Sequence, residues 1–170
     1  SPLMVRELLQ AVSEIKEQAT SLVLCGGEKF FSLGFNLPEL LELDRDSMQD
    51  FFYGFNQVAF ELTTLPFPTV CAVRGHAVAG GTIFALTCDF RVAAVGRTLM
   101  GLNEVPLGVP VPYLTDLTLR QLVGDAAARA MLFKGELKNA EDLLPLGLVD
   151  RVLDKEEVEP AVQELARELA

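Results

Sequence analysis

The chain has 170 residues, a formal net charge of −10 and a hydrophobic fraction of 50%. This length allows one domain with a sizeable core, and the apolar content argues against disorder. The acidic balance argues against a nucleic-acid partner, because phosphate backbones are bound by basic surfaces. No membrane span is expected, since the longest uncharged apolar stretch, 75–88, is too short and contains glycines. No signal or transit peptide is visible either.

Hydrophobic spacing and turn residues predict the elements in chain order. In the N-terminal half we expect a helix over 2–15, strands over 21–25 and 29–34, helical turns over 36–43, a helix over 47–64 and a strand over 69–73. Ser1, Asn36 and Asp46 are the expected helix caps.

A glycine turn over 75–81 separates this half from the next. Beyond it we expect a helix over 82–88, strands over 90–94 and 98–101, helices over 111–122, 126–133 and 139–144, a strand over 149–153 and a helix over 155–170. Strands that alternate with helices pair in parallel, so the predicted fold class is α/β, with a mostly parallel sheet packed by helices.

The cysteines Cys25, Cys71 and Cys88 form an odd set without a CxxC spacing. All three lie in apolar runs, and free cysteines in such runs are usually buried. We therefore interpret them as reduced core residues, which indicates a reducing compartment.

The segment 72–89, AVRGHAVAGGTIFALTCD, runs from a strand through glycines into a helix. Such a turn directs backbone N–H groups at whatever lies above it, and the helix dipole adds positive potential there. It could hold an anion, or an oxygen that becomes an anion during a reaction. A pair of glycines alone is more often structural.

Two other segments carry chemistry. In FSLGFNLPEL (31–40), Gly34 permits a sharp bend that can turn the N–H of Phe35 outward, although an ordinary strand-to-helix turn is the simpler interpretation. In GLNEVPLGVPVP (101–112), Glu104 stands among apolar residues. If buried, its carboxyl has a raised pKa, which suits a general base or acid near neutral pH, whereas a surface loop glutamate is the alternative.

Taken together, these segments resemble the enoyl-CoA hydratase/isomerase family, or crotonase superfamily. The runs FSLGFNL, AVRGHAVAGG, CDFRVAA and GLNEVPLG follow the order and spacing of that family's motifs, and LLPLGLVDRV (143–152) is similar to a later one. The resemblance covers nearly the whole chain. It implies a crotonase-like spiral of ββα units, an acyl-CoA thioester as substrate without a separate cofactor or metal, and a homotrimer or hexamer.

The resemblance also implies the site residues. By motif position, the backbone N–H groups of Phe35 and Gly80 would hold the thioester oxygen as it becomes an enolate. The expected substrate-binding residues surround these two donors: Ser32, Leu33, Gly34, Asn36, Leu37, Gly81 and Ile83. The expected walls of the acyl site come from the apolar residues of 37–67, among them Phe51, Phe52, Phe55 and Phe60.

Hydratases of this family use two glutamates to activate water. Glu104 matches one of them, and Ile83 stands in the place of the other. A single carboxylate can still carry a proton from C2 to C4, and an apolar Ile83 would exclude water. The sequence therefore predicts a Δ3,Δ2-enoyl-CoA isomerase.

Two alternatives remain open. Another crotonase chemistry, such as hydration, thioester hydrolysis or decarboxylation, would need a second polar group in the pocket, for example Asp116 or Asn56. A non-catalytic acyl-CoA-binding or assembly protein would bind without turnover. The lone His76 is interpreted as a packing residue, and Asp89 and Arg91 are expected to fix a helix-to-strand connection.

Compared with the family pattern, residues 1–170 are expected to form a single crotonase-like core domain without the first strands and the C-terminal helices. Ala79 stands where the first glycine of a GGG run is usual. An alanine is harmless there with ordinary backbone angles and strained if φ is positive. The expected location is the cytoplasm or, in a eukaryote, the mitochondrial or peroxisomal matrix.

Overall fold

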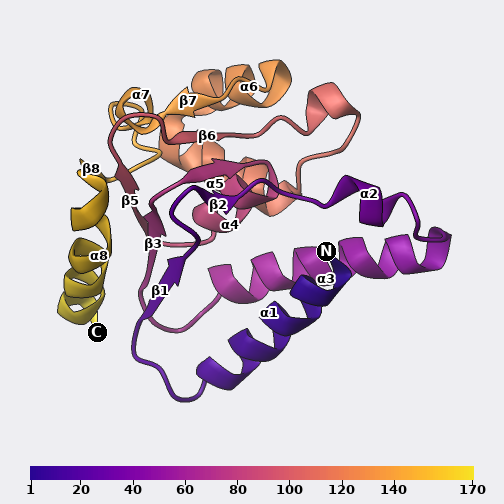
Figure 1. Cartoon of the computed structure of the whole chain (residues 1–170), viewed down its shortest axis with the longest axis horizontal. Helices are drawn as coiled ribbons and strands as arrows, with labels where there is room; N and C mark the ends of the chain where they lie inside the picture. Colours follow the sequence, from indigo (N-terminus) through magenta and orange to yellow (C-terminus); the bar gives the residue numbers. More distant parts are fainter.

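The computed structural model describes residues 1–170 and has the predicted α/β class, with two mostly parallel sheets packed by helices (Figure 1). The first sheet has the order β1 (Leu22–Cys25), β3 (Thr69–Val73), β5 (Phe90–Ala94) and β8 (Arg151–Leu153), all parallel. The second has the order β2 (Phe30–Ser32), β4 (His76–Val78), β6 (Leu99–Gly101) and β7 (Lys138–Asn139), in which only the β6–β7 pair is antiparallel.

The helices cover the sheets and extend beyond them. They are α1 (Pro2–Ile15), α2 (Leu37–Leu40), α3 (Arg45–Thr63), α4 (Gly80–Leu86), α5 (Tyr113–Val123), α6 (Asp125–Lys134), α7 (Ala140–Leu143) and α8 (Lys155–Leu169), with a 3₁₀ turn η1 (Val105–Leu107). None of them combines the length and apolar composition that a bilayer crossing requires.

The structure differs from the sequence prediction at a few element boundaries. Strand β4 lies inside the expected glycine turn, and α4 begins two residues early, at Gly80. The cap of α3 is Asp44 rather than Asp46, because the Asp44 carboxylate accepts a hydrogen bond from the backbone N–H of Ser47 at 2.8 Å.

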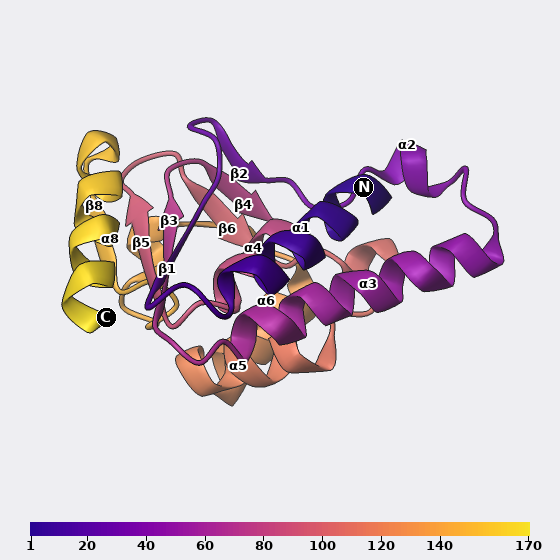
Figure 2. The same ribbon diagram turned by 90° about the horizontal axis from the view of Figure 1, so that it is seen from below.

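Strand β3 separates two hydrophobic clusters, because successive side chains of a strand point to opposite faces. Val70 and Ala72 pack in a small cluster with residues of β5 and α8. Cys71 and Val73 belong to the main core, which includes residues of α1, α3 and α4. Figure 2 shows α8 on one side of the first sheet and α1 and α3 on the other. The candidate site lies on the side of the main core.

Arg91 and Asp89 fix the connection from α4 to β5, as expected. The Asp89 carboxylate accepts hydrogen bonds from the backbone N–H and the hydroxyl of Thr69, both at 2.8 Å. The Arg91 side chain is only 1% exposed and donates to the carbonyls of Leu148, Cys88 and Asp89. A buried charge of this kind is tolerated because its donors are satisfied.

The prediction for the cysteines is correct for Cys71 and Cys88, which are buried, and wrong for Cys25, which is exposed. Cys25 is the last residue of β1, which is an edge strand and has a neighbour, β3, on one side only.

Candidate active site

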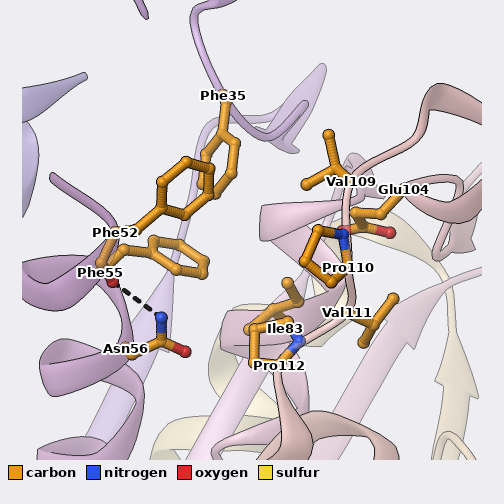
Figure 3. Close-up of a pocket in the computed structure, with 10 residues that line it drawn as sticks. All are labelled: Phe35, Phe52, Phe55, Asn56, Ile83, Glu104, Val109, Pro110, Val111 and Pro112. Atoms are coloured by element: carbon orange, nitrogen blue, oxygen red, sulfur yellow. Dashed lines mark hydrogen bonds between the residues drawn. The ribbon is translucent and has the colours of Figure 1, made fainter. Parts of the chain in front are cut away.

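A cavity of about 110 Å³ opens between α3, the start of α4 and the segment that follows β6 (Figure 3). Its lining residues come from four parts of the chain: Phe35, Phe52, Phe55, Asn56, Ile83, Glu104, Val109, Pro110, Val111 and Pro112. Three residues singled out from the sequence, Phe35, Ile83 and Glu104, therefore meet in one cavity.

Glu104 is buried, which decides between the two alternatives that its segment left open, a buried carboxyl and a surface loop glutamate. It is 5% exposed, and neither carboxylate oxygen has a hydrogen-bond partner in the chain. Leu102, fully buried two residues earlier, anchors the segment, and the Glu104 carbonyl accepts the N–H groups of Leu107 and Val109 in the turn that follows. Burial raises the pKa of the Glu104 carboxyl above its ordinary value. A carboxyl of this kind can both accept and return a proton near neutral pH.

The two candidate backbone donors come from neighbouring loops. Phe35 follows β2 in a loop, and its N–H donates no hydrogen bond within the chain. Gly80 is the first residue of α4, where N–H groups lack an intrahelical acceptor. A Cβ placed on Gly34 would lie 3.2 Å from the backbone nitrogen of Gly80, so the two loops are in contact. The approach depends on a glycine at 34, which also has a φ of +89°.

Glycine also permits α4 to pack on β2. A Cβ on Gly81 would lie 2.2 Å from the carbonyl oxygen of Ser32. The Ser32 hydroxyl in turn accepts the N–H of Gly34 at 3.2 Å, which shapes the loop before Phe35. Ser32, Gly34, Phe35 and Gly80 line a second, smaller cavity of about 20 Å³ under this loop.

Three expected substrate-binding residues, Leu33, Asn36 and Leu37, line neither cavity and are not buried. Asn36 occupies the cap position of α2, but its side chain makes no capping hydrogen bond and donates to Glu39 at 3.0 Å instead. The predicted cap position is therefore correct, but the side-chain hydrogen bond expected of a cap is absent.

The aromatic wall follows the helical period of α3. Phe52 and Phe55 line the larger cavity, and Phe51 packs edge-to-face on Phe35, with ring centroids 5.1 Å apart. Phe60 is 53% exposed and lines neither cavity, so the prediction that it walls the acyl site is wrong. Residues 51, 55, 58, 59 and 62 share the buried face of the helix, and residue 60 falls on the other face.

Of the two polar residues considered from the sequence, Asn56 lines the cavity and Asp116 does not. The Asp116 carboxylate is bound to Arg120 one helical turn later, at 2.9 Å. The Asn56 amide donates from Nδ2 to the carbonyl of Phe52 at 2.7 Å. The sequence reasoning missed the opposite wall, Val109 to Pro112, although an apolar run with two prolines directly after Glu104 was the available signal.

Ala79 has φ +51° and ψ −120°, and it is the only non-glycine residue with a positive φ. This is the unfavourable case foreseen for an alanine at the glycine position, because the Cβ clashes with its own backbone there. The strained residue directly precedes Gly80, and strain often collects at functional turns.

His76 serves to connect two strands of the second sheet. Its Nδ1 accepts the N–H of Leu99 at 3.1 Å, which links β4 to β6, and its ring lies 5.9 Å from that of Phe30. His76 lines neither of the two cavities, which agrees with its interpretation as a packing residue. The chain has no group of three or more His, Cys, Asp or Glu side chains arranged to hold a metal.

The comparisons with known proteins identify the family. Residues 1–170 match the enoyl-CoA hydratase/isomerase family, so the chain belongs to it. An enoyl-CoA delta isomerase 3 from Arabidopsis thaliana is 32% identical over 153 residues, which are 86% of this chain and 64% of that protein. A short-chain-enoyl-CoA hydratase from Clostridium acetobutylicum is 29% identical over 168 residues, which are 97% of this chain and 64% of that protein.

Solved structures agree with this assignment. Human mitochondrial Δ3-Δ2-enoyl-CoA isomerase superposes with a TM-score of 0.93 at 27% identity, over 100% of this chain and 68% of that one. An enoyl-CoA hydratase from Bacillus anthracis superposes with a TM-score of 0.92 at 28% identity, over 99% of this chain and 66% of that one. The fold is thus that of the crotonase superfamily, and the chain spans just under two thirds, 64%, of the curated relatives named above. Isomerases and hydratases occur at similar identity, so the reaction must be argued from the site.

Proposed function

We propose that the protein is a Δ3,Δ2-enoyl-CoA isomerase, which moves a double bond from C3 to C2 of an acyl-CoA thioester. The observation that supports it best is the pair of residues at the two glutamate positions. Glu104 is a buried carboxyl without a partner, whereas Ile83, in the same cavity, cannot ionise. One acid/base group is enough for a proton transfer from carbon to carbon, but addition of water is helped by two.

In this proposal Glu104 does all the proton transfer. The carboxylate removes a proton from C2, and the electron pair of that C–H bond moves into the C1–C2 bond while the thioester oxygen becomes negative. The protonated Glu104 then returns the proton to C4, the C2–C3 double bond forms, and the thioester carbonyl is restored. The raised pKa of the carboxyl suits it to both steps.

The backbone N–H groups of Phe35 and Gly80 are the proposed donors to the enolate oxygen. Both groups are free of other acceptors, and their loops are in contact. One such donor contributes about 3 kcal/mol to stabilisation of the transition state. Ile83 and the wall from Val109 to Pro112 would keep water from the intermediate.

The test is an isomerase assay with 3-hexenoyl-CoA, followed by the absorbance of the conjugated 2-enoyl thioester. Glu104→Gln should lower kcat by roughly 10²- to 10⁴-fold, because the amide cannot accept the proton. Glu42→Gln, at an exposed glutamate outside the cavity, serves as the matched control and should retain wild-type turnover. Full turnover by Glu104→Gln would exclude the mechanism, and faster hydration of 2-hexenoyl-CoA than isomerisation would exclude the assignment.

Asn56 supports a second candidate, hydration of a 2-enoyl-CoA, because its amide is the additional polar group in the cavity. An amide cannot ionise, so Asn56 could orient a water but not activate it, and the expected hydration is slow. Loss of hydration in Asn56→Leu, with isomerisation absent from the wild type, would favour this candidate.

From the family resemblance we also propose a homotrimer or hexamer, and a location in the cytoplasm or an organelle matrix. The coenzyme A thioester is the proposed substrate, without a separate cofactor. Sedimentation of the protein with and without an acyl-CoA would test the assembly.

A further inference from the structure

The cavity contains two polar side chains, Glu104 and Asn56, and the other lining residues are apolar. Figure 3 places the two polar residues on opposite sides of the cavity, with Asn56 on α3 and Glu104 beyond Ile83 and Pro110. Glu104 is used by the proposed reaction. Asn56 is not, so its role needs a separate explanation.

The Asn56 amide keeps its oxygen free, and one of its two Nδ2 hydrogens is also unbound in the chain. Its Nδ2 donates to the carbonyl of Phe52 at 2.7 Å, which fixes the side chain against α3. This orientation leaves Oδ1 without a hydrogen bond in the chain, and Figure 3 shows the oxygen on the side of Ile83 and Pro112. An amide oxygen only accepts hydrogen bonds, so the ligand group that satisfies it must be a donor.

The size of the cavity limits the chain that reaches Asn56. A cavity of about 150 Å³ admits a benzene molecule, so one of about 110 Å³ has room for roughly four or five carbons. With the thioester carbonyl at Phe35 and Gly80, the carbons from C2 onward would fill it. The last carbon of a chain of roughly six would then lie near Asn56.

We propose that the preferred substrate is a short enoyl-CoA, of about six carbons, with a hydroxyl group at its far end, and that Asn56 is the residue that determines this specificity. The inference rests on the isomerase function proposed above. An aliphatic end would cover the Asn56 oxygen without offering a donor, whereas a hydroxyl would donate to it. Asn56 is exposed at the outer edge of the cavity, so the discrimination is moderate.

The experiment compares kcat/KM for 3-hexenoyl-CoA, 6-hydroxy-3-hexenoyl-CoA and 3-decenoyl-CoA. The wild type should prefer the hydroxylated six-carbon substrate over the plain one by about fivefold to tenfold. Asn56→Leu should bring that ratio below one, because leucine has a similar shape and no acceptor. Gln49→Leu makes the same kind of change at an exposed position of α3 outside the cavity and should keep the wild-type ratio. Decenoyl-CoA should react at least tenfold more slowly than hexenoyl-CoA.

Three results would each overturn the inference. The first is a wild-type ratio of kcat/KM, hydroxylated over plain hexenoyl-CoA, of one or less. The others are a ratio that Asn56→Leu leaves unchanged and equal rates for the six-carbon and ten-carbon substrates. Failure of the isomerase assignment is distinguished by binding of the unreactive hexanoyl-CoA and 6-hydroxyhexanoyl-CoA, measured by calorimetry. If no 3-enoyl-CoA is converted, tighter binding of the hydroxylated thioester by wild type, and its loss in Asn56→Leu, would still support the specificity. Equal binding of the two thioesters would refute it.

Discussion

Replacement of Ala79 by glycine should stabilise the protein, although it removes a methyl group. Ala79 has φ +51° and ψ −120°, a conformation that costs a residue with a Cβ about 1–3 kcal/mol. Glycine relieves this strain but adds about 0.5–1 kcal/mol of backbone entropy to the unfolded chain. The half-buried methyl group contributes a few tenths of a kcal/mol more. The balance of these three contributions predicts that Ala79→Gly raises the free energy of unfolding by about 1 kcal/mol.

Thermal and urea unfolding measure this gain. For a chain of this length, about 1 kcal/mol corresponds to a rise in Tm of roughly 2–4 °C. Ala85→Gly, on the buried face of α4, is the matched control and should lose about 1 kcal/mol or more, because helical alanine has no strain to release. If Ala79→Gly lowers Tm as Ala85→Gly does, the positive φ is not a source of strain and the reasoning fails.

Four further predictions follow from the buried groups. Glu104→Gln should raise the free energy of unfolding at neutral pH, because a raised folded-state pKa makes the carboxylate destabilising there. This gain should shrink below about pH 4, where the carboxyl is protonated in both the folded and the unfolded chain. A gain that does not vary with pH would contradict this reasoning. Arg91→Met should cost about 3 kcal/mol in urea unfolding, since three carbonyls lose their donor; a loss below 1 kcal/mol would mean that these bonds contribute little. Gly81→Ala should cost about 3 kcal/mol, because its Cβ would meet the Ser32 carbonyl at 2.2 Å, and an unchanged Tm would refute this packing. Ile83→Glu should increase hydration of 2-hexenoyl-CoA by roughly tenfold or more, since it restores a second carboxyl to the cavity, and unchanged hydration by a folded variant would count against the two-carboxyl argument.

The parts of the site that depend on local backbone chemistry could be predicted from the sequence. Gly34 and Gly81 stand at positions where a Cβ would collide with another segment, and glycine is the visible signal of such approaches. The apolar neighbours of Glu104 made a buried carboxyl one of two alternatives, and the structure shows that it is the correct one. These residues came from three motifs whose order and spacing resemble those of one family, and that resemblance implied a single site.

The parts that depend on long-range packing could not be predicted. Whether Asn56 or Asp116 enters the cavity depends on how α3 and α5 pack against the site. This packing cannot be deduced from the sequence of either helix. Phe60 was expected in the wall because it is an apolar residue of the segment 37–67, although its helical phase places it on the exposed face. The burial of Cys25 was predicted from its apolar run, but the residue is exposed because β1 is an edge strand.

The division of β3 between two clusters has a consequence for how the protein can move and evolve. Helix α8 contributes no residue to the larger cavity, and its cluster lies on the opposite face of β3 from the main core. Local opening of α8, seen as exchange of its amide hydrogens, can therefore occur while the main core on the side of the cavity stays closed. During evolution, the residues packed beneath α8 can therefore be replaced with little effect on the cavity.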